Sequence, residues 1–150
     1  MIAKPEGEAG GCVLTMDQMA RIHAASFTVP RPWAAAEFAD LMSMRGVFCE
    51  ATSQGFVVGR LIAGEAELLT LAVDPAARRR GMGRALLAKF LSHLGESDRA
   101  FLEVAAGNAP ARALYRASGW AESGLRRGYY RHPDRQSEDA VIMTWAFSRT

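Results

Sequence analysis

The sequence predicts one α/β domain built on a mixed, mostly antiparallel sheet. Hydrophobic periodicity changes along the 150 residues in the order helix, helix, three strands, helix, strand, helix and two strands. The stretch from Glu67 to Val104 has the pattern of a strand, a helix and a second strand, which joins two parallel neighbours by a right-handed crossover. Hydrophobic residues make up 49% of the chain, a composition typical of globular proteins, and the length suits a single domain over residues 1–150.

The first half of the chain predicts two helices followed by an antiparallel meander. Residues 1–11 are expected to form a flexible lead-in. Thr15-Met16-Asp17-Gln18 has the Thr-x-x-Gln spacing of a capping box, so a first helix is expected from Met16 to Phe27, ended by Val29-Pro30-Arg31-Pro32. The elements expected next are a helix from Trp33 to Met44 and strands over Val47–Ala51, Gly55–Ala63 and Glu67–Val73.

The second half predicts a helix, a strand, another helix and two final strands. A helix from Ala85 to Leu94 precedes a short strand over Ala100–Val104. Asn108-Ala109-Pro110 has the pattern of an N-cap and first turn, for a helix that continues to Ala117 and closes at Gly119. The final strands are expected over Trp120–Leu125 and Ala140–Phe147, with an arginine-rich loop from Arg126 to Asp139 between them. A loop of that length indicates a functional role.

A glycine- and arginine-rich turn, Arg78-Arg79-Arg80-Gly81-Met82-Gly83-Arg84, lies between a predicted strand and a predicted helix. A helix start offers unpaired backbone N–H groups and partial positive charge, and glycines let an anion approach the backbone. The order Arg-x-x-Gly-x-Gly differs from the Gly-x-Gly-x-x-Gly of dinucleotide folds, and no Gly-Lys-Ser/Thr of a P-loop follows. The turn therefore predicts a phosphate cradle of another kind, with a solvated basic turn as the alternative.

Charge and composition narrow the function classes. Net charge is only +2 and the arginines form two local groups, which favours local anion binding over nucleic-acid binding. Cys12 and Cys49 are expected to be reduced thiols, and His23, His93 and His132 lack ligand spacing, so no metal is expected. Neither a signal-peptide pattern nor an apolar stretch long enough for a membrane span is found, so a cytoplasmic protein is expected.

Glu103, Asn108 and Tyr115 follow the turn in that order, on the next strand, just beyond it and in the following helix. With this order, residues 12–147 resemble the GNAT family of acyl-CoA-dependent N-acetyltransferases. The stretch from Leu71 to Trp120 is most similar. More narrowly, the following segments are similar to the RimI-type ribosomal-protein alanine N-acetyltransferases of that family: Leu102-Glu103-Val104, Gly107-Asn108, Ala113-Leu114-Tyr115, Gly119-Trp120, Arg126-Arg127-Gly128-Tyr129-Tyr130 and Glu138-Asp139-Ala140-Val141-Ile142-Met143. Ala105 departs from this pattern, which commonly carries an arginine there.

The resemblance implies a sheet whose parallel strands splay apart at an acetyl-CoA site, with helices on both faces. Pantetheine would lie along Leu71-Ala72-Val73, where a backbone amide near Leu71 or Val73 would stabilise the oxyanion. Asn108 is expected to contact the coenzyme, although an N-cap function alone would also explain it. The coenzyme A pyrophosphate would be held by the turn, whose residues are Arg78, Arg79, Arg80, Gly81, Met82, Gly83 and Arg84.

Acetyl transfer to an amine needs a base and an acid. A protein α-amine has a pKa of about 8, so much of it is protonated at neutral pH and cannot attack a thioester. Glu103 is a lone acid among Phe101, Leu102 and Val104, where partial desolvation makes a carboxylate a better base. An outward-facing strand carboxylate is the alternative. Tyr115 matches the family's acid, since a protonated phenol can donate to the leaving thiolate.

The resemblance implies that the acceptor is a protein N-terminal amine, with the N-terminal alanine of a small-subunit ribosomal protein preferred. Trp33, Tyr129 and Tyr130 are the expected acceptor-site residues, because both of their segments flank the acceptor side in the family's fold. Each could instead be a core anchor or close the loop. Two other functions remain open: a GNAT acetyltransferase acting on a lysine side chain or small amine, and a non-catalytic acyl-CoA-binding module.

Overall fold

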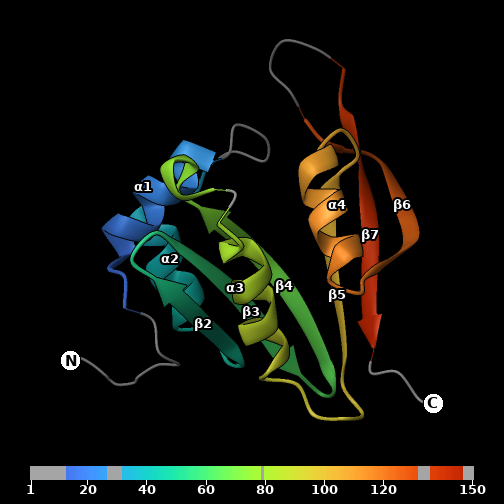
Figure 1. Ribbon diagram of the computed structural model, residues 1–150, viewed down its shortest axis with the longest axis horizontal. Helices are drawn as coiled ribbons and strands as arrows, with labels where there is room; N and C mark the ends of the chain where they lie inside the picture. Colours follow the sequence, from blue (N-terminus) through green and yellow to red (C-terminus); the bar gives the residue numbers. More distant parts are fainter. Residues whose placement is uncertain (1–12, 27–31, 79, 132–135, 147–150) are drawn as a thin grey trace.

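The computed structural model describes residues 13–26, 32–78, 80–131 and 136–146, which form a six-stranded mixed sheet with helices on both faces (Figure 1). The strand order is β2-β3-β4-β5-β7-β6, and the predicted fold class is confirmed. The elements in chain order are α1 (Met16–Ser26), α2 (Ala35–Met42), β2 (Val47–Thr52), β3 (Gly55–Ile62), β4 (Glu65–Val73), the 3-10 helix η1 (Pro75–Ala77), α3 (Met82–Leu91), β5 (Arg99–Ala105), α4 (Ala109–Ala117), β6 (Ala121–Tyr130) and β7 (Glu138–Ala146).

Strands β4 and β5 form the parallel pair, and they separate soon after they meet. Their register pairs are Glu65 with Arg99, Ala66 with Ala100 and Glu67 with Phe101. Within the described residues of these strands the pairing goes no further, and Figure 1 shows the two ribbons diverging from that end. The expected splay of the parallel strands is therefore present.

A β-bulge bends β4 where it leaves β5. On β3, the consecutive residues Val58 and Gly59 pair with Thr70 and Leu68, so Leu69 is an extra residue in β4. The extra residue shifts the alternation of side chains, because a bulge places two residues opposite one. As a result Leu68 packs in the core beneath α3, whereas Thr70 hydrogen-bonds to α1 on the opposite face of the sheet.

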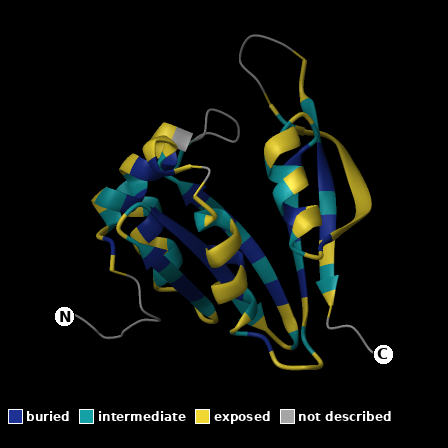
Figure 2. Ribbon diagram, in the orientation of Figure 1, coloured by how far each residue is buried: buried dark blue, intermediate teal, exposed yellow. Residues whose placement is uncertain are grey.

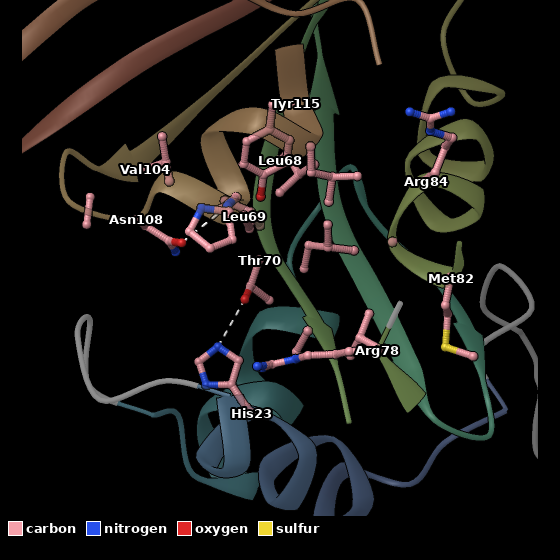
Figure 3. A pocket seen from close by; sticks show the side chains of 18 of the residues that line it. His23, Leu68, Leu69, Thr70, Arg78, Met82, Arg84, Val104, Asn108 and Tyr115 are labelled. Carbon is pink, nitrogen blue, oxygen red and sulfur yellow. Dashed lines mark hydrogen bonds between the residues drawn. The ribbon is translucent and has the colours of Figure 1, made fainter. Parts of the chain in front are cut away.

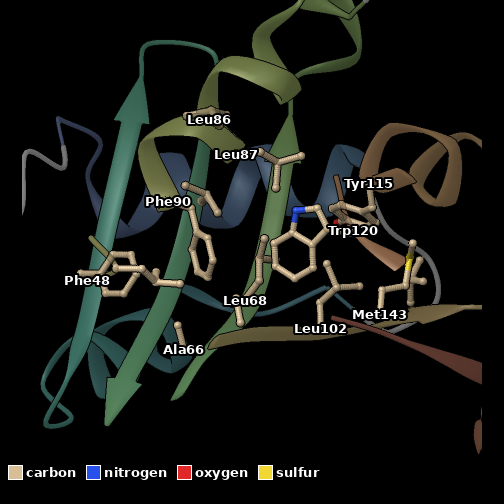
Figure 4. Packing of buried hydrophobic residues seen from close by; sticks show 14 of the residues in the cluster. Phe48, Ala66, Leu68, Leu86, Leu87, Phe90, Leu102, Tyr115, Trp120 and Met143 are labelled. Carbon is tan, nitrogen blue, oxygen red and sulfur yellow. The ribbon is translucent and has the colours of Figure 1, made fainter. Parts of the chain in front are cut away.

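Each face of the sheet has its own core. Phe48, Phe90 and Trp120 pack together beneath α3 and α4 (Figure 4). A Cβ atom at Gly59 would lie 2.5 Å from Phe90 Cε1, so only glycine allows the ring to pack flat on β3. On the other face, α1 and α2 cover Phe56 with Met19 and Phe38. Figure 2 shows buried residues along the inner strands of the sheet, and exposed residues on the outer sides of the helices.

The predicted helix starts are correct in α1 and wrong in α3. Gln18 Oε1 accepts from Thr15 N–H and Thr15 Oγ1 accepts from Gln18 N–H, which is the expected capping box. The helix expected from Ala85 instead begins at Met82, because Gly81 takes φ +75° as its N-cap and ends the turn earlier. The first helix was expected to extend to Phe27, which lies with the other residues of 27–31 outside the described part of the chain.

The arginine-rich loop expected from Arg126 to Asp139 is mostly strand. β6 continues to Tyr130 and β7 begins at Glu138. An edge strand tolerates exposed charged residues, and β6 accommodates them with a register shift between Arg126 and Tyr130 around Gly128, whose φ is +61°. Polarity alone therefore suggested a loop where an edge strand exists.

No helix in the described part of the chain combines the length and apolar character that a membrane crossing requires.

Candidate active site

A cavity of about 800 Å³ opens where β4 and β5 separate (Figure 3). Its walls come from β4, the start of α3, β5, the start of α4, α1 and the end of β6. Most of the predicted site residues line it: Trp33, Leu71, Ala72, Val73, Arg78, Gly81, Met82, Gly83, Arg84, Glu103, Asn108, Tyr115 and Tyr130.

Two predicted site residues are not part of the cavity wall, and a third lies outside the described residues. Arg80 is exposed and does not line the cavity. Arg79 is outside the described residues. Tyr129 is also not part of the wall; it is 46% exposed and packs edge-on against Tyr130, with ring centroids 5.1 Å apart. Successive strand residues point in opposite directions, which is consistent with Tyr130 and not Tyr129 lining the wall.

The N-terminus of α3 lines the cavity. Ala85 N–H bonds to Gly81 carbonyl oxygen, so the amides of Met82, Gly83 and Arg84 precede this bond of the helix. A Cβ atom added at Gly81 would have no described atom within 4 Å, so open space borders the turn. Gly83 lines the cavity, and a Cβ there would lie 3.0 Å from Leu114 Cδ2, so the glycine also allows Leu114 of α4 to approach α3 closely.

The start of α4 forms the opposite wall. Asn108 Oδ1 accepts from Ala111 N–H at 3.2 Å, which makes Asn108 the helix N-cap, and the residue also lines the cavity. Two turns further along, Tyr115 is buried beside Trp120. Burial raises the pKa of Tyr115 well above its ordinary value, and the nearby Tyr130 adds to the shift. The hydroxyl of Tyr115 is therefore protonated throughout the neutral range.

Glu103 faces away from the α3 and α4 core. Its strand neighbours Leu102 and Val104 are buried in that core, so alternation directs Glu103 to the opposite face of the sheet. Its carboxylate has 15% of its surface exposed and lies 2.6 Å from Arg126 Nε on β6, in an ion pair whose angle is not that of a hydrogen bond. Charge from Glu103, together with partial burial and a hydrogen bond to that carboxylate, raises the pKa of Tyr129.

Tyr130 is electrostatically linked to both Glu103 and Tyr115. Burial raises the pKa of Tyr130 to about 12, with further contributions from Glu103, Tyr129 and Glu138. Tyr130 in turn influences Tyr115, so its hydroxyl is within electrostatic range of both Glu103 and Tyr115. Residues from both faces of the sheet line the cavity, with Tyr115 on the α4 side and Glu103 on the opposite side, which α1 covers.

His23 is the principal cavity residue that sequence reasoning missed. It lies on α1, is only 1% exposed, and borders the cavity beside Thr70. Burial lowers the pKa of His23 to about 4, and the charge of Glu37 offsets this in part. The sequence analysis considered His23 only as a metal ligand, and no group of three His, Cys, Asp or Glu side chains in the described ranges is placed to hold a metal.

The remaining unpredicted wall residues are small or apolar. The signal that could have found them is strand adjacency, because they neighbour predicted residues on β4, β5 and α4. They are Leu68, Leu69, Thr70, Ala77, Val104, Ala105, Pro110, Ala111 and Leu114.

Comparison of the sequence with known protein families and proteins identifies the family of this chain. Residues 16–120 match the acetyltransferase (GNAT) family, and the chain belongs to that family. The chain is 36% identical over 140 residues to the [ribosomal protein bS18]-alanine N-acetyltransferase of Escherichia coli K12, covering 89% of this chain and 94% of the relative. It is 38% identical over 121 residues to the N-alpha-acetyltransferase RimI of Mycobacterium tuberculosis, covering 75% of this chain and 76% of that protein.

A solved structure supports the same relationship. The crystal structure of the Escherichia coli ribosomal-protein-S18-alanine N-acetyltransferase superposes with a TM-score of 0.78 at 31% sequence identity, covering 90% of this chain and 89% of that chain.

Proposed function

We propose that this protein transfers the acetyl group of acetyl-CoA to the N-terminal α-amine of a protein, with the N-terminal alanine of a small-subunit ribosomal protein as the preferred acceptor. The observation that carries the proposal is the cavity between β4 and β5, which brings Glu103, Tyr115 and the α3 N-terminus to one place. The similarity to two N-acetyltransferases over most of the chain supports the acceptor class.

The donor would enter from the side of α3 and α4. The backbone amides of Met82, Gly83 and Arg84 suit a pyrophosphate, because a helix start combines free donors with partial positive charge. Beyond Glu67, the edge of β4 that faces β5 has no register partner among the described residues of that strand. An extended pantetheine can pair with this edge as an added strand would.

The acceptor amine would meet the thioester from the other face. Glu103 removes a proton from the protonated amine, directly or through water, and the neutral nitrogen then attacks the thioester carbonyl carbon and loses its second proton to water as the tetrahedral intermediate collapses. The carbon–sulfur bond breaks, the amide forms, and the sulfur leaves as a thiolate. Backbone amides of the segment Leu71-Ala72-Val73 offer donors to the oxygen that becomes negative during the attack.

Tyr115 would act on the leaving sulfur. It lies on the α4 side of the cavity, opposite Glu103, so the acid and the base approach the reacting carbon from different faces. A thiol has a pKa of about 8.5 by analogy with cysteine, below that of the buried tyrosine, so full ionisation of the phenol is uphill. The hydrogen bond to the developing thiolate therefore supplies most of the stabilisation.

Two other functions would use the same cavity. A lysine or small-amine acetyltransferase would use the same donor site with a different acceptor. A non-catalytic acyl-CoA-binding module would need neither Glu103 nor Tyr115, yet both line the cavity.

A peptide series separates these functions. Peptides that differ only at their first residue (Ala, Ser, Gly, Met or Leu) are incubated with acetyl-CoA, and released thiol and peptide mass are measured. A blocked peptide with one lysine and a polyamine serve as controls. We expect Ala to be acetylated fastest and the blocked peptide to be inert, and Tyr130→Ala to slow every peptide. Equal rates for Ala, Met and the blocked lysine peptide would reject the N-terminal proposal.

A further inference from the structure

His23 occupies a position that the mechanism above does not use. It is a buried histidine on α1, and its ring touches three parts of the cavity region. The Trp33 backbone N–H donates to His23 Nδ1 at 3.0 Å. Nε2 lies 3.0 Å from Thr70 Oγ1 on β4. The imidazole also stacks on the Trp33 indole, with centroids 5.0 Å apart and planes 24° from parallel.

These contacts define one tautomer. Because Nδ1 accepts a hydrogen bond from a backbone amide, it carries no proton, and the proton of the neutral ring is on Nε2. Nε2–H therefore donates to Thr70 Oγ1, which leaves the threonine's own hydroxyl hydrogen for an acceptor of its own. Burial, which lowers the pKa of His23 to about 4, keeps the ring in this neutral form. A protonated ring would lose the bond from Trp33.

The position of His23 links it to the acceptor and not to the coenzyme. Thr70 points to the α1 face of the sheet, the face that also carries Glu103. Figure 3 shows His23 and Thr70 joined by their hydrogen bond, with Arg84 and Met82 on α3 and Tyr115 on α4 at other parts of the wall. Trp33 borders the cavity on the same side as His23.

We propose that His23 is a positioning residue for the acceptor: its ring holds the Trp33 backbone and indole and orients the Thr70 hydroxyl, which together form the wall that receives the first residue of the acceptor peptide. This inference rests on the proposed function, and it extends that function by naming what shapes the acceptor side. His23 itself does not exchange a proton with substrate. It acts through Trp33 and Thr70.

The test compares variants in steady-state acetylation of the alanine peptide. His23→Phe keeps a stacking ring and removes both hydrogen bonds. We expect it to raise KM for the peptide by about 10-fold or more, the effect of one to two lost hydrogen bonds, with KM for acetyl-CoA within about 2-fold of wild type. The preference for Ala over Met should also decrease, because an unanchored Trp33 no longer fixes the size of the site. His23→Gln, which retains one donor and one acceptor, should recover part of the peptide affinity.

Two further variants keep the test decisive. His93→Phe is the matched control: His93 also stacks on an aromatic ring, Phe48, and pairs with a side chain, Glu50, but does not line the cavity. It should leave both KM values unchanged. Thr70→Val removes the hydroxyl that accepts from Nε2–H and keeps a β-branched side chain, so it tests the connection even if His23→Phe does not fold. Its effect should not add to that of His23→Phe in the double variant.

The outcomes separate this inference from the proposed function. A wild-type enzyme that acetylates no N-terminal peptide overturns the proposed function. A wild type active on the alanine peptide, combined with an unchanged peptide KM in His23→Phe and Thr70→Val, overturns the positioning inference alone. An equal rise in both KM values would also overturn it, because that is the result expected of a general loss of structure.

Discussion

Glu103→Gln tests the chemistry most directly, since it replaces the proposed base by a neutral isostere. The carboxylate has 15% of its surface exposed and its ion-pair partner Arg126 has 56% exposed. An ion pair with so exposed a partner contributes at most about 1 kcal/mol to stability. We therefore expect Glu103→Gln to fold with a melting temperature close to that of wild type, so that any loss of turnover reports on catalysis.

The expected loss and its pH dependence follow from the amine. Removing a positioned base lowers turnover by about 10²-fold to 10⁴-fold. Without it, the rate depends on the fraction of acceptor that is already neutral. With an amine pKa of about 8, this fraction is about one in eleven at pH 7 and about ten in eleven at pH 9. The variant should therefore recover about 10-fold between pH 7 and pH 9.

The assay is turnover of the alanine peptide from pH 6 to pH 9 at saturating acetyl-CoA, with acetyl-CoA affinity measured by calorimetry. Arg126→Ala is the control, because it removes the same ion pair but leaves the carboxylate, and its turnover should stay within a few-fold of wild type. If Glu103→Gln turned over like wild type, or if Arg126→Ala lost as much activity as Glu103→Gln, the carboxylate would not be the base.

Three other predictions concern the acid, the donor site and stability. Tyr115→Phe should lower kcat by about 10²-fold to 10³-fold with no recovery at pH 9, and recovery there would contradict a role on the leaving sulfur. Gly81→Glu should abolish acetyl-CoA binding, measured by calorimetry, while the fold is retained. No described atom lies within 4 Å of the Cβ position, and a side chain at the φ of +75° costs about 1 kcal/mol. Gly83→Glu should lose both acetyl-CoA binding and stability, because its side chain would contact Leu114. The pKa of His23 is about 4 in the folded protein against 6.5 in the unfolded chain, so the unfolded chain binds the proton first as pH falls. The neutral ring therefore contributes about 3 kcal/mol to the free energy of unfolding above pH 6.5, and this contribution is lost as pH falls to 4. Urea titrations of His23→Phe should lack that pH dependence.

Sequence patterns predicted this fold where the local signal and the tertiary environment agree. The capping box at Thr15 and the N-cap at Asn108 depend on hydrogen bonds within a few residues, and both are present. The strand predicted to end at Leu125 continues as β6, although the polarity of the arginines beyond it indicates a loop. The place of β6 at the sheet edge depends instead on its pairing with β7. Edge pairing is a long-range property that composition does not carry.

The candidate site shows the same division. The turn from Arg78 to Arg84 could be found from sequence because a helix start and its glycines are adjacent in the chain. The bulge at Leu69 could not, since it is defined by the register of β3 against β4. The sequence showed His23 only as a histidine without metal-ligand spacing, and its two partners, Trp33 and Thr70, are 10 and 47 residues away.

The opposed placement of the proposed base and the proposed acid follows from strand periodicity and not from any single contact. In β5, Leu102 and Val104 are buried under α4, so Glu103 between them must face the other side of the sheet. Tyr115 packs into the α4 core and therefore approaches the cavity from the first side. Two groups on opposite faces can reach one reacting carbon only if the sheet is open between them, and β4 and β5 stop pairing at Glu67 and Phe101, just before Glu103. The splay is therefore a requirement of the proposed mechanism as well as a property of the fold. Inserting one residue between Leu102 and Glu103 should abolish turnover even in protein that remains folded, because a shift of one residue moves the carboxylate to the wrong face.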